Sequence, residues 1–448
     1  MIFRFKTISV FMSHLFFGWA LVCLAQAEAM ASAEVSEEVV LTLDSAVERL
    51  KAQSPRLLFE RETVKRALAS QDQVRSALLP HFSVTGQQTR QRSGNSYAVS
   101  PGQGNPNSSF RSRIEARQVL FDGVKYSELG AAKIAYDVAE LDYAVLLEDL
   151  LELMAQLFYT QLRDLKQVEI IETNIERDQA LLALARQQYD AGAAILLDVT
   201  RAEVRVATQR RILMQAQTQA QNSLLQLKSL LDFDLERSVR VDHAEYNQLL
   251  LLELREQDSE FLALAEQRPE LRSQRQAVEQ AEVVKQAAAW KRLPTLEAFG
   301  DWGYDSGEIF DDEEGEAWLV GIRASIPLFE GGRIAAQKRE ASAALRQSEY
   351  RLRELENELK REFHFTRIDM DSRYAQIEIA QEELRLGQAE VEQAEQRYRE
   401  GLADNRELID ARQNLADAEN SHLQAIYFYA LSRLAFARAT GDVARFFE

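Results

Sequence analysis

Few residues of this 448-residue chain have the types and spacing that catalysis or metal binding requires. The sequence has no glycine-rich phosphate loop and no nucleophile elbow. The acidic run from Asp311 to Glu314 lacks the alternating spacing of a calcium loop, so we interpret it as a solvated loop. No two histidines have the spacing of a metal-ligand pair: His14, His81, His243, His364 and His422. The chain is therefore predicted not to be an enzyme and to need no cofactor or metal.

One pair of carboxylates has a spacing with a physical consequence. Glu407 and Asp410 are three positions apart in a predicted helix, which places both side chains on one face. A solvated acidic helix face is one interpretation of this pair.

The elements that position this pair are two very long predicted helices. Residues 122–189 contain no proline, and their apolar side chains recur three or four apart. At ~1.5 Å per residue such a helix is ~100 Å long. A second stretch, residues 333–398, has the apolar cadence of a coiled coil. After each long helix, a turn and a shorter helix that runs back beside it are predicted. These return helices lie at about 197–231 and 407–440.

The chain is duplicated. Pro55 and Pro80 frame a short helix, and Pro269 and Pro294 frame another, at the same interval of 25 residues. The two long helices start at similar four-residue sequences, Leu120-Phe121-Asp122-Gly123 and Leu328-Phe329-Glu330-Gly331. They also end at similar sequences, Tyr189-Asp190-Ala191-Gly192 and Tyr398-Arg399-Glu400-Gly401. We predict two structural repeats, residues 28–241 and 242–448, that together form one protomer.

Between the helices, apolar residues occur at every second position, and this alternation predicts β-strands. The strands fall at 110–120 and 318–328, with partners at 81–91 and 295–304, and each half therefore has one hairpin. About ten residues is the length of a tilted membrane strand. The hairpin loops are long and polar.

Four strands cannot close a barrel wide enough for a passage, and open strand edges are not tolerated in lipid. Three chains would together supply twelve strands, which is enough to close such a barrel. Trp302, Tyr304 and Trp318 suit an aromatic belt at a membrane interface. The alternative is a soluble hairpin that caps a helical bundle.

The first 27 residues have the features of a signal peptide: Arg4 and Lys6, an apolar core, and Ala25-Gln26-Ala27 as cleavage site. An uncleaved membrane helix is the alternative. Cys23, the single cysteine, lies in this leader and is not expected to be lipidated, because Val22 is too large for a usual lipoprotein cleavage site.

The formal net charge is −18, and loss of the two leader cations would make it −20. An acidic exported protein is a poor candidate for binding nucleic acid.

From about residue 40 to 441 the chain resembles the TolC-like outer-membrane efflux protein family. The resemblance rests on Leu41-Thr42-Leu43-Asp44, the proline-framed helices, the junction Ile326–Arg333, the Tyr-x-x-Gly turns and the duplication. It implies a mainly α homotrimer, with a twelve-stranded β-barrel in the outer membrane and a twelve-helix tunnel across the periplasm. Such proteins are passive exit ducts of tripartite efflux pumps or type I secretion systems. They dock with an inner-membrane pump through a periplasmic adaptor.

The resemblance also assigns roles to residues at the helix tips. It places Glu407 and Asp410 in two acidic rings at the periplasmic constriction, and it implies a closed-state hydrogen bond between Asp198 and Tyr398. The arginine that the family has two positions after the second turn glycine is replaced by Ala403, and Arg406 is the candidate substitute.

The same resemblance makes the turns Gly192-Ala193 and Gly401-Leu402 the adaptor-docking tips. Ala193 is smaller than the apolar residue that the family usually has there. The rival class is a periplasmic coiled-coil adaptor or structural spacer without a channel. The sequence names neither the cargo nor the pump.

Overall fold

The computed structural model describes residues 38–91, 107–242, 267–307, 309, 315–441 and 443. The predicted signal peptide with Cys23 and the Asp311–Glu314 run lie outside these residues, as do His14 and His243. The elements in chain order are β1 (Val39–Leu41), α2 (Leu43–Gln53), α3 (Pro55–Ser76), β2 (His81–Gln91), β3 (Asn107–Phe121), α4 (Gly123–Asp190), α5 (Leu196–Leu230), β4 (Val239–Val241), α8 (Pro269–Trp290), β5 (Thr295–Ser306), β6 (Gly315–Ser325), α9 (Arg333–Arg399) and α10 (Asn405–Thr440).

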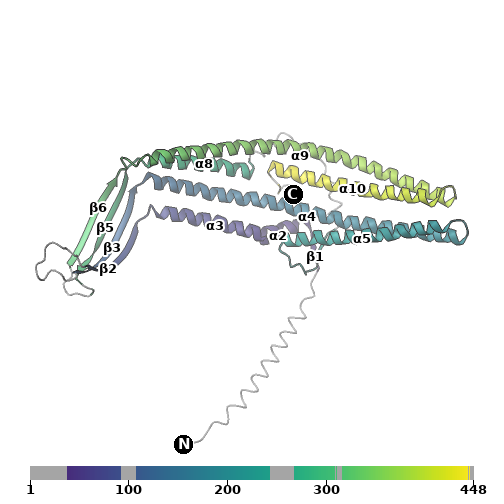
Figure 1. Cartoon of the computed structure of the whole chain (residues 1–448), viewed down its shortest axis with the longest axis horizontal. Helices are drawn as coiled ribbons and strands as arrows, with labels where there is room; N and C mark the ends of the chain where they lie inside the picture. The colour runs from purple at the N-terminus through teal and green to yellow at the C-terminus, as the bar shows by residue number, and fades with distance from the viewer. Residues whose placement is uncertain are drawn as a thin grey trace, which may run out of the picture.

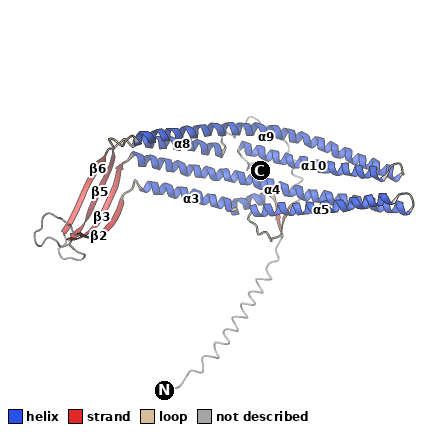
Figure 2. Cartoon of the chain, viewed as in Figure 1, coloured by secondary structure: helices blue, strands red, loops and turns tan. Residues whose placement is uncertain are grey.

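The protomer is elongated, with a β-sheet at one end and helices running away from it (Figures 1 and 2). The shorter helices α3 and α5 lie one after the other along α4, and α8 and α10 follow each other along α9. This end-to-end arrangement confirms the expectation that short and return helices together match the length of the outgoing ones. No helix among the described residues is long and apolar enough to cross a membrane.

The two long helices begin and end close to their predicted bounds. The side chain of Asp122 caps α4 by accepting hydrogen bonds from the backbone N–H groups of Val124 and Lys125, at 3.0 and 3.3 Å. Along α4, Ile134, Leu150 and Met154 are buried, as the apolar spacing predicted.

The proline-framed helices begin as predicted but end three residues early. Both prolines stand at the first helical position. The final residues form tight turns in which the N–H of Leu79 donates to Ser76 O and that of Leu293 to Trp290 O. Leu79 and Leu293 each precede a proline, whose ring disfavours the helical conformation of the residue before it.

The four strands form one sheet in the order β2-β3-β5-β6, so the two predicted hairpins lie side by side. All neighbours are antiparallel, and a bulge interrupts the β3–β5 ladder between Val119 and Phe121. The prediction of a strand over 318–328 was wrong at its end, because β6 stops at Ser325. Pro327 has no N–H to donate, so Ile326 and Leu328 leave the ladder.

The sheet has one apolar and one charged face. Val84, Ile114, Trp302 and Trp318 lie opposite one another across the four strands, and all are exposed. On the other face, Arg113 lies 3.2 Å from Asp301 and 2.7 Å from Asp305. The alternation predicted from the sequence therefore produces a sheet with two chemically distinct surfaces.

The main core lies midway along the helices and contains an element that the sequence did not suggest. β1 and β4 pair as a parallel two-stranded sheet, with Val39 opposite Val239. Apolar side chains from these strands, α2, α4, α5 and α10 pack together around Phe158, which is fully buried. The pairing joins the start of the described chain to the connection that follows α5.

Candidate functional site

The helix tips at the end opposite the sheet carry most of the predicted site residues (Figure 1). Gly192 and Gly401 have φ values of 74° and 71°, which favour glycine at the end of a helix. The N–H groups of Ala193 and Leu402 each donate to a carbonyl five residues earlier, at 2.8 Å. Ala193 and Leu402 are exposed, so both turns present apolar side chains to solvent.

The acidic pair lies in the first turns of α10, next to cations. Asp404 caps α10 by accepting hydrogen bonds from the N–H groups of Arg406 and Glu407, both at 3.1 Å. Glu407 and Asp410 are exposed, as expected for side chains on one outer helix face. Arg397 of α9 donates to Glu407 at 2.8 Å, and the sequence reasoning missed this partner.

The predicted hydrogen bond between Asp198 and Tyr398 is not formed in this structure. The Tyr398 side chain is 6% exposed, and its hydroxyl has no hydrogen-bond partner among the described residues. The ring packs against an apolar cluster of α4 and α10 that includes Leu181 and Leu408. The Asp198 carboxylate lies 3.5 Å from Arg201 instead. Burial, and then the nearby charge of Asp198, raises the pKa of Tyr398.

Asn405 makes the contact between hairpins that was expected of Tyr398. Its Nδ2 donates to the backbone carbonyl of Asp198 at 2.9 Å, and the side chain is almost fully buried. The bond connects the first turn of α10 to the first turn of α5. Its position at the first residue of α10, directly after the capping Asp404, gave no sign of this role.

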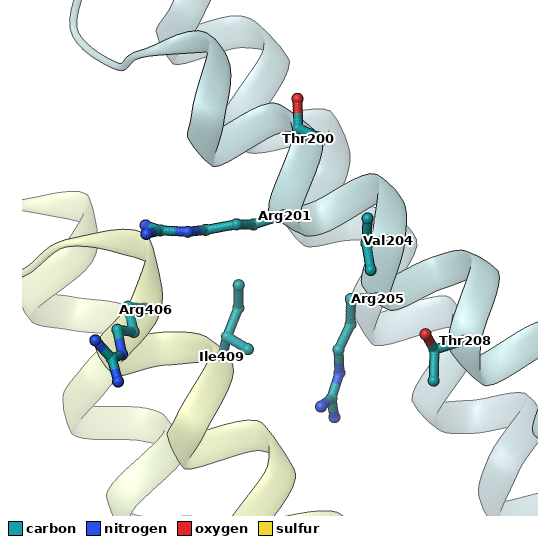
Figure 3. Close-up of a pocket in the computed structure, with 7 residues that line it drawn as sticks. All are labelled: Thr200, Arg201, Val204, Arg205, Thr208, Arg406 and Ile409. Carbon is teal, nitrogen blue, oxygen red and sulfur yellow. The ribbon is translucent and has the colours of Figure 1, made fainter.

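Arg406 does not bridge the hairpins as predicted. Its Nε lies 3.8 Å from Asp410 of the same helix, and both side chains are mostly exposed. Arg406 also borders an open cavity of about 540 Å³ between α5 and α10, together with Arg201 and Ile409 (Figure 3). Arg201 extends across this space toward α10, and Arg205 points into the space between the helices farther from the tips.

A cluster of charged and polar side chains around the buried Asp178 lies deeper along the helices and connects α4, α5, α9 and α10. Asp178 of α4 is 3.0 Å from Arg205 of α5 and 3.8 Å from Arg412 of α10. Arg412 also donates to Glu395 of α9 at 2.8 Å, and Arg205 donates to Gln413 of α10 at 2.6 Å. We call these five residues the inter-hairpin cluster.

A second polar contact lies beyond this cluster, farther from the tips. Glu419 of α10 accepts hydrogen bonds from Asn174 at 3.0 Å and from Arg177 at 2.7 Å, both on α4. Asn174 and Asp178 occupy buried positions of α4 beside the apolar Ile175 and Leu181. Polar residues within an apolar seam were the sequence signal that could have identified these contacts.

At the other end of the molecule, the three predicted belt residues lie together on the apolar face of the sheet. Trp302 pairs across the ladder with Trp318, and its ring centroid is 5.3 Å from that of Tyr304. The indole N–H of Trp302 donates to Glu316 at 2.8 Å. Their place at the end of the sheet remote from the helices suits a membrane interface.

The described residues contain no cluster of three or more His, Cys, Asp or Glu side chains that could hold a metal ion. The polar groups at the tips and in the inter-hairpin cluster are paired mainly with one another. Such an arrangement can hold two helical hairpins together and set the charge of the surfaces between them.

Comparison with known proteins is consistent with this architecture. A family model described as "Outer membrane efflux protein" matches residues 46–232 and 262–442. The chain is 24% identical to the pyoverdine export outer membrane protein OpmQ of Pseudomonas aeruginosa, over 85% of this chain and 81% of that protein. It is also 24% identical to the alkaline protease secretion protein AprF of the same species, over 75% and 71%. The fold matches the outer membrane protein VceC of Vibrio cholerae with a TM-score of 0.79 and 18% identity, over 89% of this chain and 96% of that one.

Proposed function

Because this chain belongs to the outer membrane efflux protein family, we propose that three copies form a passive channel through which cargo leaves the cell. The protein is an outer-membrane protein with a long periplasmic helical part. Its three copies would join their sheets into a twelve-stranded barrel and their helices into a twelve-helix tunnel. The family is one of transport channels, and the chain itself carries out no chemical step.

One observation supports this proposal most strongly, the two faces of the sheet. The apolar face, with Trp302 and Trp318, suits lipid, and the face with Arg113 and Asp301 suits a water-filled lumen. Both edges of the four-stranded sheet lack a partner within the described chain. Unpaired edges are not stable in lipid, so the sheet needs further copies to close.

The proposed partners are an inner-membrane pump and a periplasmic adaptor. OpmQ is named for pyoverdine export and AprF for alkaline protease secretion, so the names of these two relatives refer to different cargoes. We therefore keep two candidate systems for this chain, a tripartite efflux pump and a type I secretion system. The exposed turns Gly192-Ala193 and Gly401-Leu402 are the proposed adaptor contacts.

The proposed gate is the α9/α10 hairpin, which would swing away from α4/α5 to open the tunnel. Glu407 and Asp410 of three copies would form the two acidic rings at the constriction. Two sets of contacts that would hold the closed state are present in the protomer. They are the hydrogen bond from Asn405 to the Asp198 carbonyl and the ion pairs of the inter-hairpin cluster. Arg406 and Tyr398 would act there only after a rearrangement.

Fractionation and single-channel recording test this function. The protein should sediment with outer membranes, run as a trimer in mild detergent and conduct ions in a planar bilayer. The rival periplasmic adaptor or spacer would remain in the periplasmic fraction and would not conduct. A monomer that dissolves without detergent and passes no ions would reject the channel.

A further inference from the structure

The cavity between α5 and α10 differs in charge from the chain as a whole. It has a volume of about 540 Å³ and lies close to the helix tips. Three of the residues that line it are arginines, Arg201, Arg205 and Arg406, and the others are two threonines and two aliphatic residues (Figure 3). The whole chain has 71 Asp and Glu residues against 53 Lys and Arg residues, yet no carboxylate is among these lining residues. The cavity therefore presents a cationic surface within an acidic protein.

The three arginines come from both hairpins. Arg201 and Arg205 lie four positions apart on α5, which places both side chains on one face of that helix. Arg406 lies in the first turn of α10, on the other side of the cavity. Figure 3 shows the side chain of Arg201 extending across this space toward α10. Each hairpin thus places positive charge beside the same space, and these like charges repel one another unless an anion lies between them.

The arginines differ in how far their N–H groups are used. Arg205 is held by Asp178 at 3.0 Å and by Gln413 at 2.6 Å. In contrast, the nearest carboxylate to Arg201 is that of Asp198 at 3.5 Å, and its side chain is 40% exposed. Arg406 lies 3.8 Å from its own nearest carboxylate and is 74% exposed. A guanidinium has five N–H donors, so Arg201 and Arg406 can both donate to a further acceptor.

The remaining lining residues limit what the acceptor can be. The Thr200 hydroxyl already donates to the carbonyl of Leu196 at 3.1 Å, which leaves the Thr208 hydroxyl as a further donor on the α5 side. Val204 and Ile409 add apolar surface to the same space. Guanidinium groups match the geometry of carboxylate and phosphate groups, to which they donate two parallel hydrogen bonds. The lining therefore suits a small oxyanion better than a cation or a neutral polar ligand.

We propose that this cavity binds a small oxyanion, through a carboxylate or phosphate group that bridges Arg201 of α5 and Arg406 of α10. The bound anion offsets the repulsion between the two arginines and connects the two hairpins. Arg406, which makes no direct link to α5, acquires an indirect one. The effect on gating rests on the proposed channel, because the anion ties the hairpin that would move to the hairpin that would stay. An occupied cavity therefore favours the closed tips.

The size of this effect follows from binding to one state only. A ligand that binds the closed but not the open conformation multiplies the closed-to-open ratio by one plus the ratio of ligand concentration to Kd. At a concentration of about ten times the Kd, the ratio rises about elevenfold. Because the cavity is open to water, added salt screens the arginines and should weaken the binding.

Inorganic phosphate tests the site in the purified full-length protein in detergent at low ionic strength. Compared with chloride at equal ionic strength, millimolar phosphate should raise the thermal unfolding midpoint and reduce the opening frequency in a planar bilayer. Acetate in a parallel titration tests the carboxylate group, and the anion with the larger midpoint shift identifies the preferred chemistry. Arg201→Gln with Arg406→Gln should abolish the responses to both anions. Arg201→Gln alone should weaken them, which keeps the test valid if the double variant misfolds.

The matched control is Lys65→Gln with Arg385→Gln, which removes the same charge from exposed ion pairs with Glu62 and Glu382. A control is needed because phosphate also stabilises proteins in general by its exclusion from their surfaces. The control variant should respond to phosphate as the unmodified protein does. Equal phosphate responses in the Arg201→Gln, Arg406→Gln variant and in the control would overturn the anion site.

The two readouts separate this proposal from the channel on which its gating effect rests. The unfolding midpoint reports binding even from a protein that does not conduct. A midpoint response that depends on Arg201 and Arg406, in a protein that passes no ions, would support the anion site and reject the channel. A conducting protein whose midpoint and opening frequency ignore both anions would reject the anion site and leave the channel standing.

Discussion

The carboxylate of Asp178 on α4 lies 3.0 Å from the Nε atom of Arg205 on α5, and these side chains are 3% and 13% exposed in the protomer. Asp178 is also 3.8 Å from Arg412 of α10, so one carboxylate faces guanidinium groups of two other helices. Charges removed from water are stable only while they remain paired. If the two hairpins separated, the charge pairs of the inter-hairpin cluster would break. The cluster therefore opposes separation of the hairpins.

Asp178→Asn should destabilise the protomer strongly. The change leaves Arg205 without its buried partner and weakens the hold on Arg412, and breaking a buried pair costs about 3–5 kcal/mol. Thermal unfolding in detergent should show a lower midpoint, and bilayer recordings should show more frequent opening. Glu382→Gln, at an exposed pair with Arg385, is the control and should change stability by less than about 1 kcal/mol. Equal midpoints for the two variants would show that the cluster does not hold the hairpins.

The charge of the proposed rings should depend on Arg397 as well as on the two acids. Glu407→Gln with Asp410→Asn should reduce cation preference, since it removes two negative charges per subunit. Arg397→Gln should increase it, because Arg397 now offsets Glu407 at 2.8 Å. Reversal potentials in a salt gradient measure both effects. At about 1 M salt the Debye length is near 3 Å, and the differences should shrink. Unchanged reversal potentials for both variants would place these side chains outside the ion path.

The length and order of the helices and both hairpins could be predicted because each follows a local rule. Apolar spacing set the span of α4, and prolines set the starts of α3 and α8. The contacts at the tips could not be predicted in the same way. Whether Asn405 or Tyr398 reaches Asp198 depends on how two hairpins pack, and the residues involved are about 200 positions apart.

Two glutamates next to Arg438 should respond oppositely to pH and mutation. Burial alone would raise the pKa of Glu270, but hydrogen bonds from Arg268 and the charge of Arg438 outweigh it, so this pKa is lowered. Glu270 therefore stabilises the fold above its unfolded pKa of about 4.3, and the contribution is lost as pH falls through the folded value. For Glu152, burial raises the pKa despite Arg438, so its ionised form at neutral pH opposes folding.

Glu270→Gln should therefore lower the unfolding midpoint at pH 7 by an amount that decreases as the pH falls below the unfolded pKa of about 4.3. Glu152→Gln, the matched control on the other side of Arg438, should leave the midpoint at pH 7 unchanged or raise it. Thermal unfolding between pH 3 and pH 8 measures both. If Glu152→Gln lowered the midpoint at pH 7 as much as Glu270→Gln does, the two carboxylates would be equivalent and the assigned pKa directions would be wrong.

Tyr398→Phe and Asn405→Ala should separate the two candidate locks at the tips. The Tyr398 hydroxyl is buried without a hydrogen bond, so its removal should be neutral or stabilise the protomer by up to about 1 kcal/mol. Asn405→Ala deletes the 2.9 Å bond to the Asp198 carbonyl and should cost about 1–2 kcal/mol. Single-channel conductance should rise for Asn405→Ala and stay unchanged for Tyr398→Phe. Asn414→Ala, which removes an exposed contact to Glu390, serves as control. A rise for Tyr398→Phe alone would mean that the closed trimer forms the Asp198–Tyr398 bond that the protomer lacks.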